Sequence, residues 1–212
     1  MSKIASLIHV NAESPDHGAI VRAAEVLREG GIIIYPTDTV YGIGCDITKP
    51  KTLERLCKIK GVPVTQANFS IICHDLSHLA DFTTPFSNPI FRVLKKALPG
   101  PYTFILEANH RVPKFFLHKK KTIGIRVPNN RIVSEIIREL GNPIVSSSVH
   151  TNDEELMEYA SDPAAIHEHF KELVDLVIQG DYPNIQNSTV IDATGGAFEV
   201  IRQGLGEVDN LW

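Results

Sequence analysis

The fold is organised around one stretch, Ile32-Ile33-Ile34-Tyr35-Pro36-Thr37-Asp38-Thr39-Val40-Tyr41-Gly42-Ile43-Gly44-Cys45-Asp46. Its β-branched start predicts a buried strand, which ends at Pro36 because proline has no amide proton for a ladder. Short polar side chains follow that strand end, where α/β sheets often bind ligands. A surface turn capped by Asp38 accounts for the same residues about equally well. The two glycines permit a close approach of the backbone.

Composition limits the classes of protein to which the chain can belong. Its 212 residues are 43% hydrophobic and 22% charged, which predicts one globular domain over residues 1–212. The net charge of −4 is not the footprint of a nucleic-acid binder, although it allows a local basic patch. The three cysteines fit no zinc or redox spacing, so we expect a cytoplasmic protein without a disulfide framework or a tightly bound metal. No stretch predicts a signal peptide or a membrane span.

Apolar periodicity alternates irregularly between strands and helices along the chain. Helices are expected from 18 to the glycines at 30 and 31, and over 51–60, 87–97, 132–140 and 163–170. Strands are expected over 7–10, 32–35, 69–73, 102–106, 122–127, 143–149 and 174–178, with a terminal hairpin over 188–192 and 198–201. The pattern predicts a mixed α/β (α+β) fold, in which a twisted mixed β-sheet is flanked by helices.

Two of these strands carry polar side chains where apolar ones are expected. Arg126 lies four residues after Thr122, so both side chains point to one face of their strand. An unpaired arginine is costly to bury, and Arg126 therefore faces either a cleft or a carboxylate partner. Ser146 and Ser148 share a face of another strand, and their hydroxyls suggest a polar cleft there.

Residues 35–44, Tyr-Pro-Thr-Asp-Thr-Val-Tyr-Gly-Ile-Gly, resemble the signature of the YrdC-like family, which contains the threonylcarbamoyl-AMP synthases. Further motifs stand in the family's order over nearly the whole chain: Leu98-Pro99-Gly100-Pro101-Tyr102-Thr103, Gly124-Ile125-Arg126-Val127-Pro128, Ser188-Thr189-Val190-Ile191-Asp192 and Arg202-Gln203-Gly204. The chain is most similar to the YciO branch. The resemblance implies the YrdC-like fold with a concave, locally positive cleft.

The resemblance also implies a reaction and a set of binding residues. The family reaction joins L-threonine, bicarbonate and ATP, with magnesium, into threonylcarbamoyl-AMP for tRNA threonylcarbamoyladenosine modification. It implies that ATP or AMP and threonine are bound by Thr37, Thr39, Tyr41, Lys60, Thr122, Arg126, Ser146, Ser148, Ser188 and Arg202. Of these, Thr37, Thr39, Ser146 and Ser188 would line the amino-acid side of the cleft.

Two departures from the family pattern leave the enzymatic activity open. The synthases usually read Lys-x-Arg-Pro where this chain has Lys60-Gly61-Val62-Pro63, and Ser-x-Asn where it has Ser148-Val149-His150. Val62 cannot replace a guanidinium fork, so the losses would lower the activity or change the substrate. Lys60 alone is also typical of a solvated cation at a helix C-terminus.

A non-catalytic RNA-binding module is the alternative function, since family members are described as binding double-stranded RNA or ribosomal components. Its patch for tRNA or duplex RNA would consist of Lys114, Lys119, Lys120, Lys121, Arg126 and Arg131. A run of lysines is more often a solvated loop. A small-ligand-binding protein that uses the same cleft is a third possibility. No nucleophilic Ser–His–Asp arrangement can be identified from the sequence.

Overall fold

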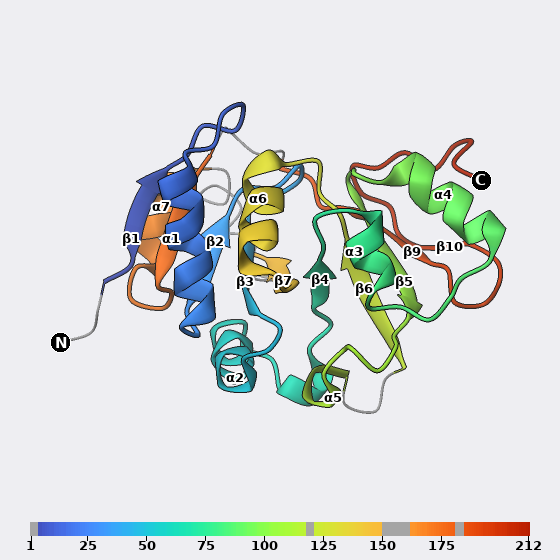
Figure 1. Cartoon of the computed structure of the whole chain (residues 1–212), viewed down its shortest axis with the longest axis horizontal. Helices are drawn as coiled ribbons and strands as arrows, with labels where there is room; N and C mark the ends of the chain where they lie inside the picture. The colour runs from blue at the N-terminus through green and yellow to red at the C-terminus, as the bar shows by residue number, and fades with distance from the viewer. Residues whose placement is uncertain (1–3, 118–120, 150–161, 181–184) are drawn as a thin grey trace.

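The computed structural model describes residues 4–117, 121–149, 162–180 and 185–212. Its strands are β1 (Ser6–His9), β2 (Ile32–Tyr35), β3 (Gly42–Asp46), β4 (Ser70–Ile72), β5 (Tyr102–Glu107), β6 (Thr122–Arg126), β7 (Ile144–Ser148), β8 (Leu176–Gln179), β9 (Thr189–Asp192) and β10 (Glu199–Arg202). They form one ten-stranded sheet in the order β1-β8-β2-β3-β7-β4-β6-β5-β9-β10 (Figure 1). Parallel pairs such as β1–β8 and antiparallel pairs such as β2–β3 both occur, which confirms the predicted mixed sheet.

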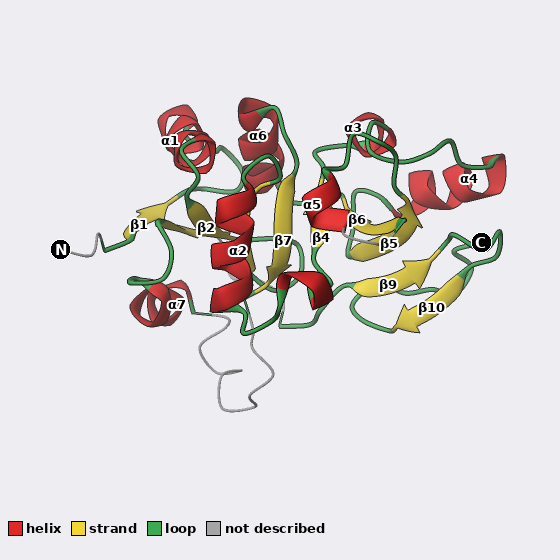
Figure 2. Ribbon diagram, turned by 90° about the horizontal axis from the view of Figure 1, so that it is seen from below, coloured by secondary structure: helices red, strands yellow, loops and turns green. Residues whose placement is uncertain are grey.

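Helices flank the sheet on both sides, as predicted. They are α1 (His17–Arg28), α2 (Pro50–Ile59), α3 (Leu76–Ala80), α4 (Asn88–Ala97), α5 (Lys114–Leu117), α6 (Arg131–Leu140) and α7 (Pro163–Phe170), with a short 3-10 turn at Val64–Gln66. Figures 1 and 2 show α1 and α6 on one side of the sheet and α7 on the other. In the described ranges, no helix combines the length and the apolar character that crossing a membrane requires.

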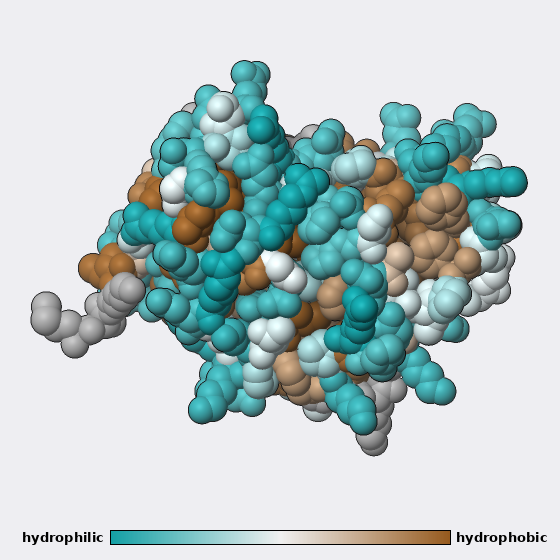
Figure 3. Space-filling model, viewed as in Figure 1, coloured by the Kyte–Doolittle hydropathy of each residue, from teal (hydrophilic) through white to brown (hydrophobic). Residues whose placement is uncertain are grey.

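The two sides of the sheet bury separate hydrophobic clusters. Ile20, Ala24 and Leu27 of α1 pack with Ile33 of β2 and with the apolar face of α6. A larger cluster joins residues of α2, α3, α4 and α7 to strands such as β4 and β5. On the face drawn in Figure 3, hydrophilic residues predominate, and hydrophobic residues gather over α4, where Phe91 is exposed. The packing therefore fixes the central strands from both sides.

Local signals in the sequence explain most element boundaries. Asn130 is the predicted N-cap of α6, and its side-chain oxygen accepts the Val133 amide at 3.2 Å. The terminal hairpin is confirmed as the antiparallel pair β9–β10.

Three of the strands and α-helices were not predicted, namely β3, α3 and α5. The glycines at 42 and 44 weaken the sequence signal for β3, because glycine is unfavourable in strands. In the structure, β2 and β7 pair with β3 on its two sides. The cysteines are buried and unbonded.

Candidate functional site

Strand register brings small and polar residues together on one face of the sheet. Ser146 of β7 lies opposite Ser70 of β4, Ser70 opposite Gly124 of β6, and Gly124 opposite Ile105 of β5. Directly paired residues point to the same face, so these four positions form a continuous floor. The floor belongs to a cavity of about 550 Å³, which is a typical size for a small-molecule site.

The walls of this cavity, called the cleft below, combine hydroxyls, arginines and apolar side chains. Its described lining is Val40, Ala67, Asn68, Phe69, Ser70, Thr103, Ile105, Phe116, Leu117, Thr122, Ile123, Gly124, Arg126, Ser146, Ser147, Ser148, Asn187, Ser188, Val190, Ile201 and Arg202. This lining contains two arginines and, within the residues that the structure describes, no carboxylate. The cleft is therefore locally positive, although the chain has a net charge of −4.

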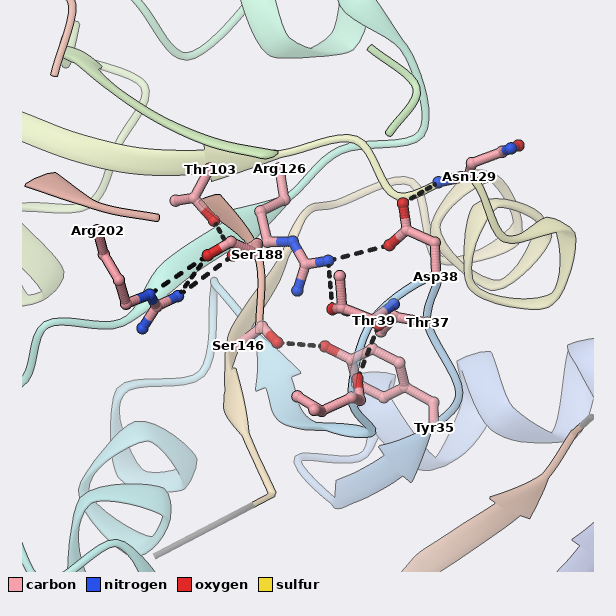
Figure 4. Close-up of polar contacts among 11 residues, drawn as sticks. Tyr35, Thr37, Asp38, Thr39, Thr103, Arg126, Asn129, Ser146, Ser188 and Arg202 are labelled. Atoms are coloured by element: carbon pink, nitrogen blue, oxygen red, sulfur yellow. Dashed lines mark hydrogen bonds and ion pairs between the residues drawn. The ribbon is translucent and has the colours of Figure 1, made fainter. Parts of the chain in front are cut away.

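Arg126 of β6 is the buried cation of the cleft. Its Nη2 donates to Asp38 Oδ1 at 3.0 Å and to Thr39 Oγ1 at 2.9 Å (Figure 4). The second carboxylate oxygen of Asp38 accepts the Asn129 amide at 2.9 Å, which fixes the acid in turn. Burial lowers the pKa of Arg126, and Asp38 opposes that shift. Arg126 thus has both features that its position in the strand predicted, a carboxylate partner and a place in the cleft lining.

The signature turn is folded by its own hydroxyls. Thr37 Oγ1 donates to the Val40 carbonyl at 2.7 Å and accepts the Thr39 amide at 3.0 Å. Both threonines are buried and lie outside the cleft lining. Thr39 contacts the cleft residue Arg126, and Thr37 contacts Thr39. Tyr41 is also buried outside the lining, and its hydroxyl accepts the Gly180 amide at 3.2 Å. Asp38 caps no surface turn, since it is held between Arg126 and Asn129.

Lys60 stands at the C-terminal end of α2 and points toward the cleft wall. Its Nζ donates to the Ser148 carbonyl at 2.9 Å, and burial lowers its pKa to about 8. Lys60 is therefore not a fully solvated cation, although it is not part of the lining itself. Val62 packs against the hydrophobic core, as a neutral branched side chain should. His150 lies outside the described residues.

Arg202 of β10 supplies the second guanidinium. Its Nη2 donates to the Ser188 carbonyl at 2.9 Å and lies 3.4 Å from Ser188 Oγ. Partial burial lowers the pKa of Arg202. Ser188 Oγ is in turn 2.8 Å from Thr103 Oγ1, so a hydroxyl of β5 and one of the turn before β9 are hydrogen-bonded to each other (Figure 4). A side chain at Gly204 would place its Cβ 2.3 Å from the Asn187 carbonyl, and glycine is needed there for this reason.

Sequence reasoning located part of this site. The predicted residues Thr122, Arg126, Ser146, Ser148, Ser188 and Arg202 line the cleft. It missed Thr103, although Thr103 belongs to a quoted motif and alternates with the buried Phe104 along β5. It also missed Tyr35, whose hydroxyl donates to Ser146 Oγ at 2.6 Å. The binding roles of the predicted residues stay predictions.

The structure describes four of the six cations predicted for the basic patch. Lys114 and Lys121 are exposed beside the start of β6, whereas Arg131 lies beyond the end of that strand, at the start of α6. Arg131 also pairs with Glu135 at 2.7 Å, and Arg126 is buried against Asp38. Lys119 and Lys120 lie outside the described residues. The described cations thus lie at the two ends of β6, and their proposed role in RNA binding stays a prediction.

Together, the fold and the site define a mixed α/β protein with a small-molecule cleft on its sheet. The Sua5/YciO/YrdC family model, described as "Telomere recombination", matches residues 25–204, and the chain belongs to this family. The uncharacterised protein YciO of Escherichia coli (strain K12) is 38% identical over 97% of this chain and 98% of its own length. A threonylcarbamoyl-AMP synthase of Halorhodospira halophila is 28% identical over 83% of this chain and 91% of its own.

Solved structures agree with this assignment. The crystal structure of E. coli YciO superposes with a TM-score of 0.86 at 37% identity, and the match covers 97% of this chain and 98% of that one. P. abyssi Sua5 complexed with L-threonine superposes with a TM-score of 0.83 at 25% identity, over 94% of this chain and 57% of that one. The resemblance and the fold predicted from the sequence are confirmed.

Proposed function

We propose that this protein binds ATP with its magnesium, L-threonine and bicarbonate in the cleft and forms threonylcarbamoyl-AMP. One observation carries the proposal: the buried Arg126, held by Asp38 and Thr39, lines a cleft that also holds Arg202 and several hydroxyls. Buried guanidinium groups recognise carboxylates and phosphates, which are the anionic groups of these substrates. A relative is named threonylcarbamoyl-AMP synthase and a Sua5 relative binds L-threonine, which supports the same ligands.

The chemistry requires positioning and charge stabilisation. The threonine amine attacks the bicarbonate carbon, water leaves, and a carbamate forms. A carbamate oxygen then attacks the α-phosphorus of ATP, and pyrophosphate leaves with the electron pair of the broken phosphoanhydride bond. Arg126 and Arg202 would stabilise the negative charge that develops on phosphate and carbamate oxygens. The described residues hold no cluster of three or more metal-binding side chains, so magnesium would enter as part of the nucleotide substrate.

Val62 stands where the synthases usually have arginine, and this difference lowers the reaction rate that we expect. Val62 packs against the core and offers no charge, and Lys60 is the remaining cation of that motif. A lost charge-assisted contact removes about 1.5–3 kcal/mol of binding, or roughly one to two powers of ten in rate. We therefore expect a slower reaction than in a relative that has Lys-x-Arg at this place.

Incorporation of isotope-labelled threonine into a nucleotide product tests the proposal. The purified protein is incubated with ATP, magnesium and bicarbonate, and the product is separated by chromatography beside a working synthase. We expect a labelled adenylate from the wild type and from Arg111→Ala, whose exposed side chain pairs with Asp81. Arg126→Ala should lose it. Absence of product from the wild type, while the synthase control works, excludes synthesis.

Calorimetric titration separates ligand binding from turnover. ATP is titrated with and without threonine and magnesium into the wild type, Lys60→Ala and Arg126→Ala. Binding that both variants lose supports the cleft as the nucleotide site. If neither ligand binds and duplex RNA binds with an affinity that falls steeply with salt, the RNA-binding alternative replaces this proposal. Transfer of the labelled product to tRNA, with the partner enzymes supplied, tests the proposed place in tRNA modification.

A further inference from the structure

The side chain of Tyr35 crosses a strand to reach a residue of the cleft floor. In the register of the sheet, Tyr35 of β2 lies opposite Gly42 of β3, and Gly44 of β3 lies opposite Ser146 of β7. All four therefore point to one face. A Cβ on Gly42 would lie 2.9 Å from two ring carbons of Tyr35, so the ring occupies the space that this glycine leaves empty. The phenol thereby reaches Ser146 Oγ across the intervening strand (Figure 4).

The direction of this hydrogen bond follows from what surrounds the phenol. Tyr35 is fully buried, and burial raises its pKa, so its hydroxyl keeps its proton. Among the described residues, Ser146 Oγ is the one acceptor within hydrogen-bond reach of that hydroxyl, at 2.6 Å. The phenol must donate there, because an undonated buried proton is costly. Ser146 accepts, and its own proton is left to point elsewhere.

The cleft is where the Ser146 proton can be used. Ser146 lines the cleft, and none of the described residues offers its hydroxyl proton an acceptor. Arg126, a donor without acceptor capacity, lines the same cleft and interacts electrostatically with Tyr35. Ser146 and Arg126 therefore both present donors to the cleft, and such a pair suits an anionic oxygen such as that of a carboxylate or a phosphate.

We propose that Tyr35 is a positioning residue that holds the Ser146 hydroxyl as a hydrogen-bond donor toward the cleft, where it selects an anionic ligand oxygen. This inference rests on the proposed function, because it concerns the same cleft and its substrates. It gives Tyr35 and Gly42 of the signature a role that filling space alone would not require. The alternative is that Tyr35 only fills the sheet interior, in which case its hydroxyl is dispensable for binding.

A double-mutant cycle separates these two roles. Titration calorimetry with L-threonine, and separately with AMP, is carried out on the wild type, Tyr35→Phe, Ser146→Ala and the double variant. We expect Tyr35→Phe to weaken binding roughly three- to tenfold, as for the loss of one well-placed hydrogen bond. On the Ser146→Ala background the same substitution should change the affinity by less than about twofold, because the hydroxyl it orients is gone.

Tyr102→Phe is the matched control for the loss of a phenol. The Tyr102 hydroxyl donates to the Glu207 carbonyl at 2.7 Å and lies outside the cleft lining. This variant should bind both ligands as the wild type does, and thermal unfolding of every variant checks its fold. If Tyr35→Phe reduces the folded fraction, 3-fluorotyrosine at position 35 gives a second test. Its more acidic phenol is a stronger donor, so affinity should rise, whereas a space-filling role predicts a loss.

The outcomes distinguish this inference from the proposed function. A loss for threonine but not for AMP identifies the carboxylate as the selected group, and the reverse identifies the phosphate. Equal weakening by Tyr35→Phe on both backgrounds, or no weakening at all, overturns the role of Tyr35 and leaves the proposed function standing. Failure of the wild type to bind either ligand overturns the proposed function, and this inference with it.

Discussion

Arg126 and Asp38 are 88 residues apart in the sequence and meet in the interior, where each side chain is 11% exposed. Taking both charges out of water costs free energy. Their ion pair, the hydrogen bond that Arg126 donates to Thr39 and the one that the Asn129 amide donates to Asp38 offset this cost. Removal of either partner leaves a buried charge without compensation. The pair therefore ties the integrity of the signature turn to the cation that faces the cleft.

Asp38→Asn should destabilise the protein by about 3 kcal/mol, because it removes the charge partner of Arg126 but keeps the shape of the side chain. Urea unfolding measures the change. Asp81→Asn is the control, since Asp81 pairs with Arg111 at the surface, where the side chains are 52% and 56% exposed. It should cost less than about 1 kcal/mol. Equal losses in the two variants would mean that the Arg126 pair is worth no more than a surface pair.

If Lys60 attracts ATP as proposed, we expect the binding to depend on pH. Burial lowers its pKa from the usual 10.5 to about 8, so the folded protein holds fewer protons than the unfolded chain between these values. The free energy of unfolding should accordingly rise with pH across that window.

The affinity for an anion should instead fall as the pH rises, because Lys60 loses its attractive charge above pH 8. ATP affinity should fall roughly tenfold from pH 7 to pH 9 in calorimetric titrations. Lys60→Met should bind weakly with a flat profile, and an unchanged slope in this variant would contradict the assignment.

At the scale of elements, β3 is the strand on which the site depends. It carries no polar side chain into the cleft, yet it separates β2 from β7 and its glycines make room for Tyr35. Gly42→Ala would place a methyl group 2.9 Å from the Tyr35 ring, and the ring cannot retreat from a fully buried position. We expect a loss of about 1–3 kcal/mol by urea unfolding.

Gly195→Ala is the counterpart of this substitution, because a Cβ at Gly195 meets nothing within 4 Å. It should leave stability within about 0.5 kcal/mol of the wild type. A similar loss at both positions would show that glycine flexibility, rather than the space for Tyr35, decides the result.

The same elements show what the sequence could and could not predict. Periodicity located β2, β6 and β7 because their apolar residues report burial directly. It missed β3 because two glycines lower the strand signal, and only pairing with neighbouring strands stabilises it there. Arg126 was predicted to face a cleft or an acid, but its partner Asp38 depends on tertiary packing. The strand pattern and the family resemblance named Ser146, and a motif named Arg202, whereas the contact between Tyr35 and Ser146 spans two strand pairings and has no local signature.

At the scale of the molecule, the cleft lies between the centre of the sheet and its C-terminal hairpin. Arg126 is on β6, near the middle of the strand order, and Arg202 is on the edge strand β10. β10 pairs with β9 alone, and all four of its residues are exposed. A ligand that touches both arginines would connect this exposed edge strand to the interior of the sheet.

Hydrogen–deuterium exchange followed by mass spectrometry tests this connection. With ATP and L-threonine at about 100 times their dissociation constants, exchange in peptides that contain Glu199–Arg202 should slow roughly tenfold or more. The opposite edge strand β1, Ser6–His9, is an internal control, since it pairs with β8 far along the strand order from the cleft. Its exchange should not change. Equal protection of both edges would indicate a general tightening of the fold, and protection of neither would mean that Arg202 does not hold the ligand.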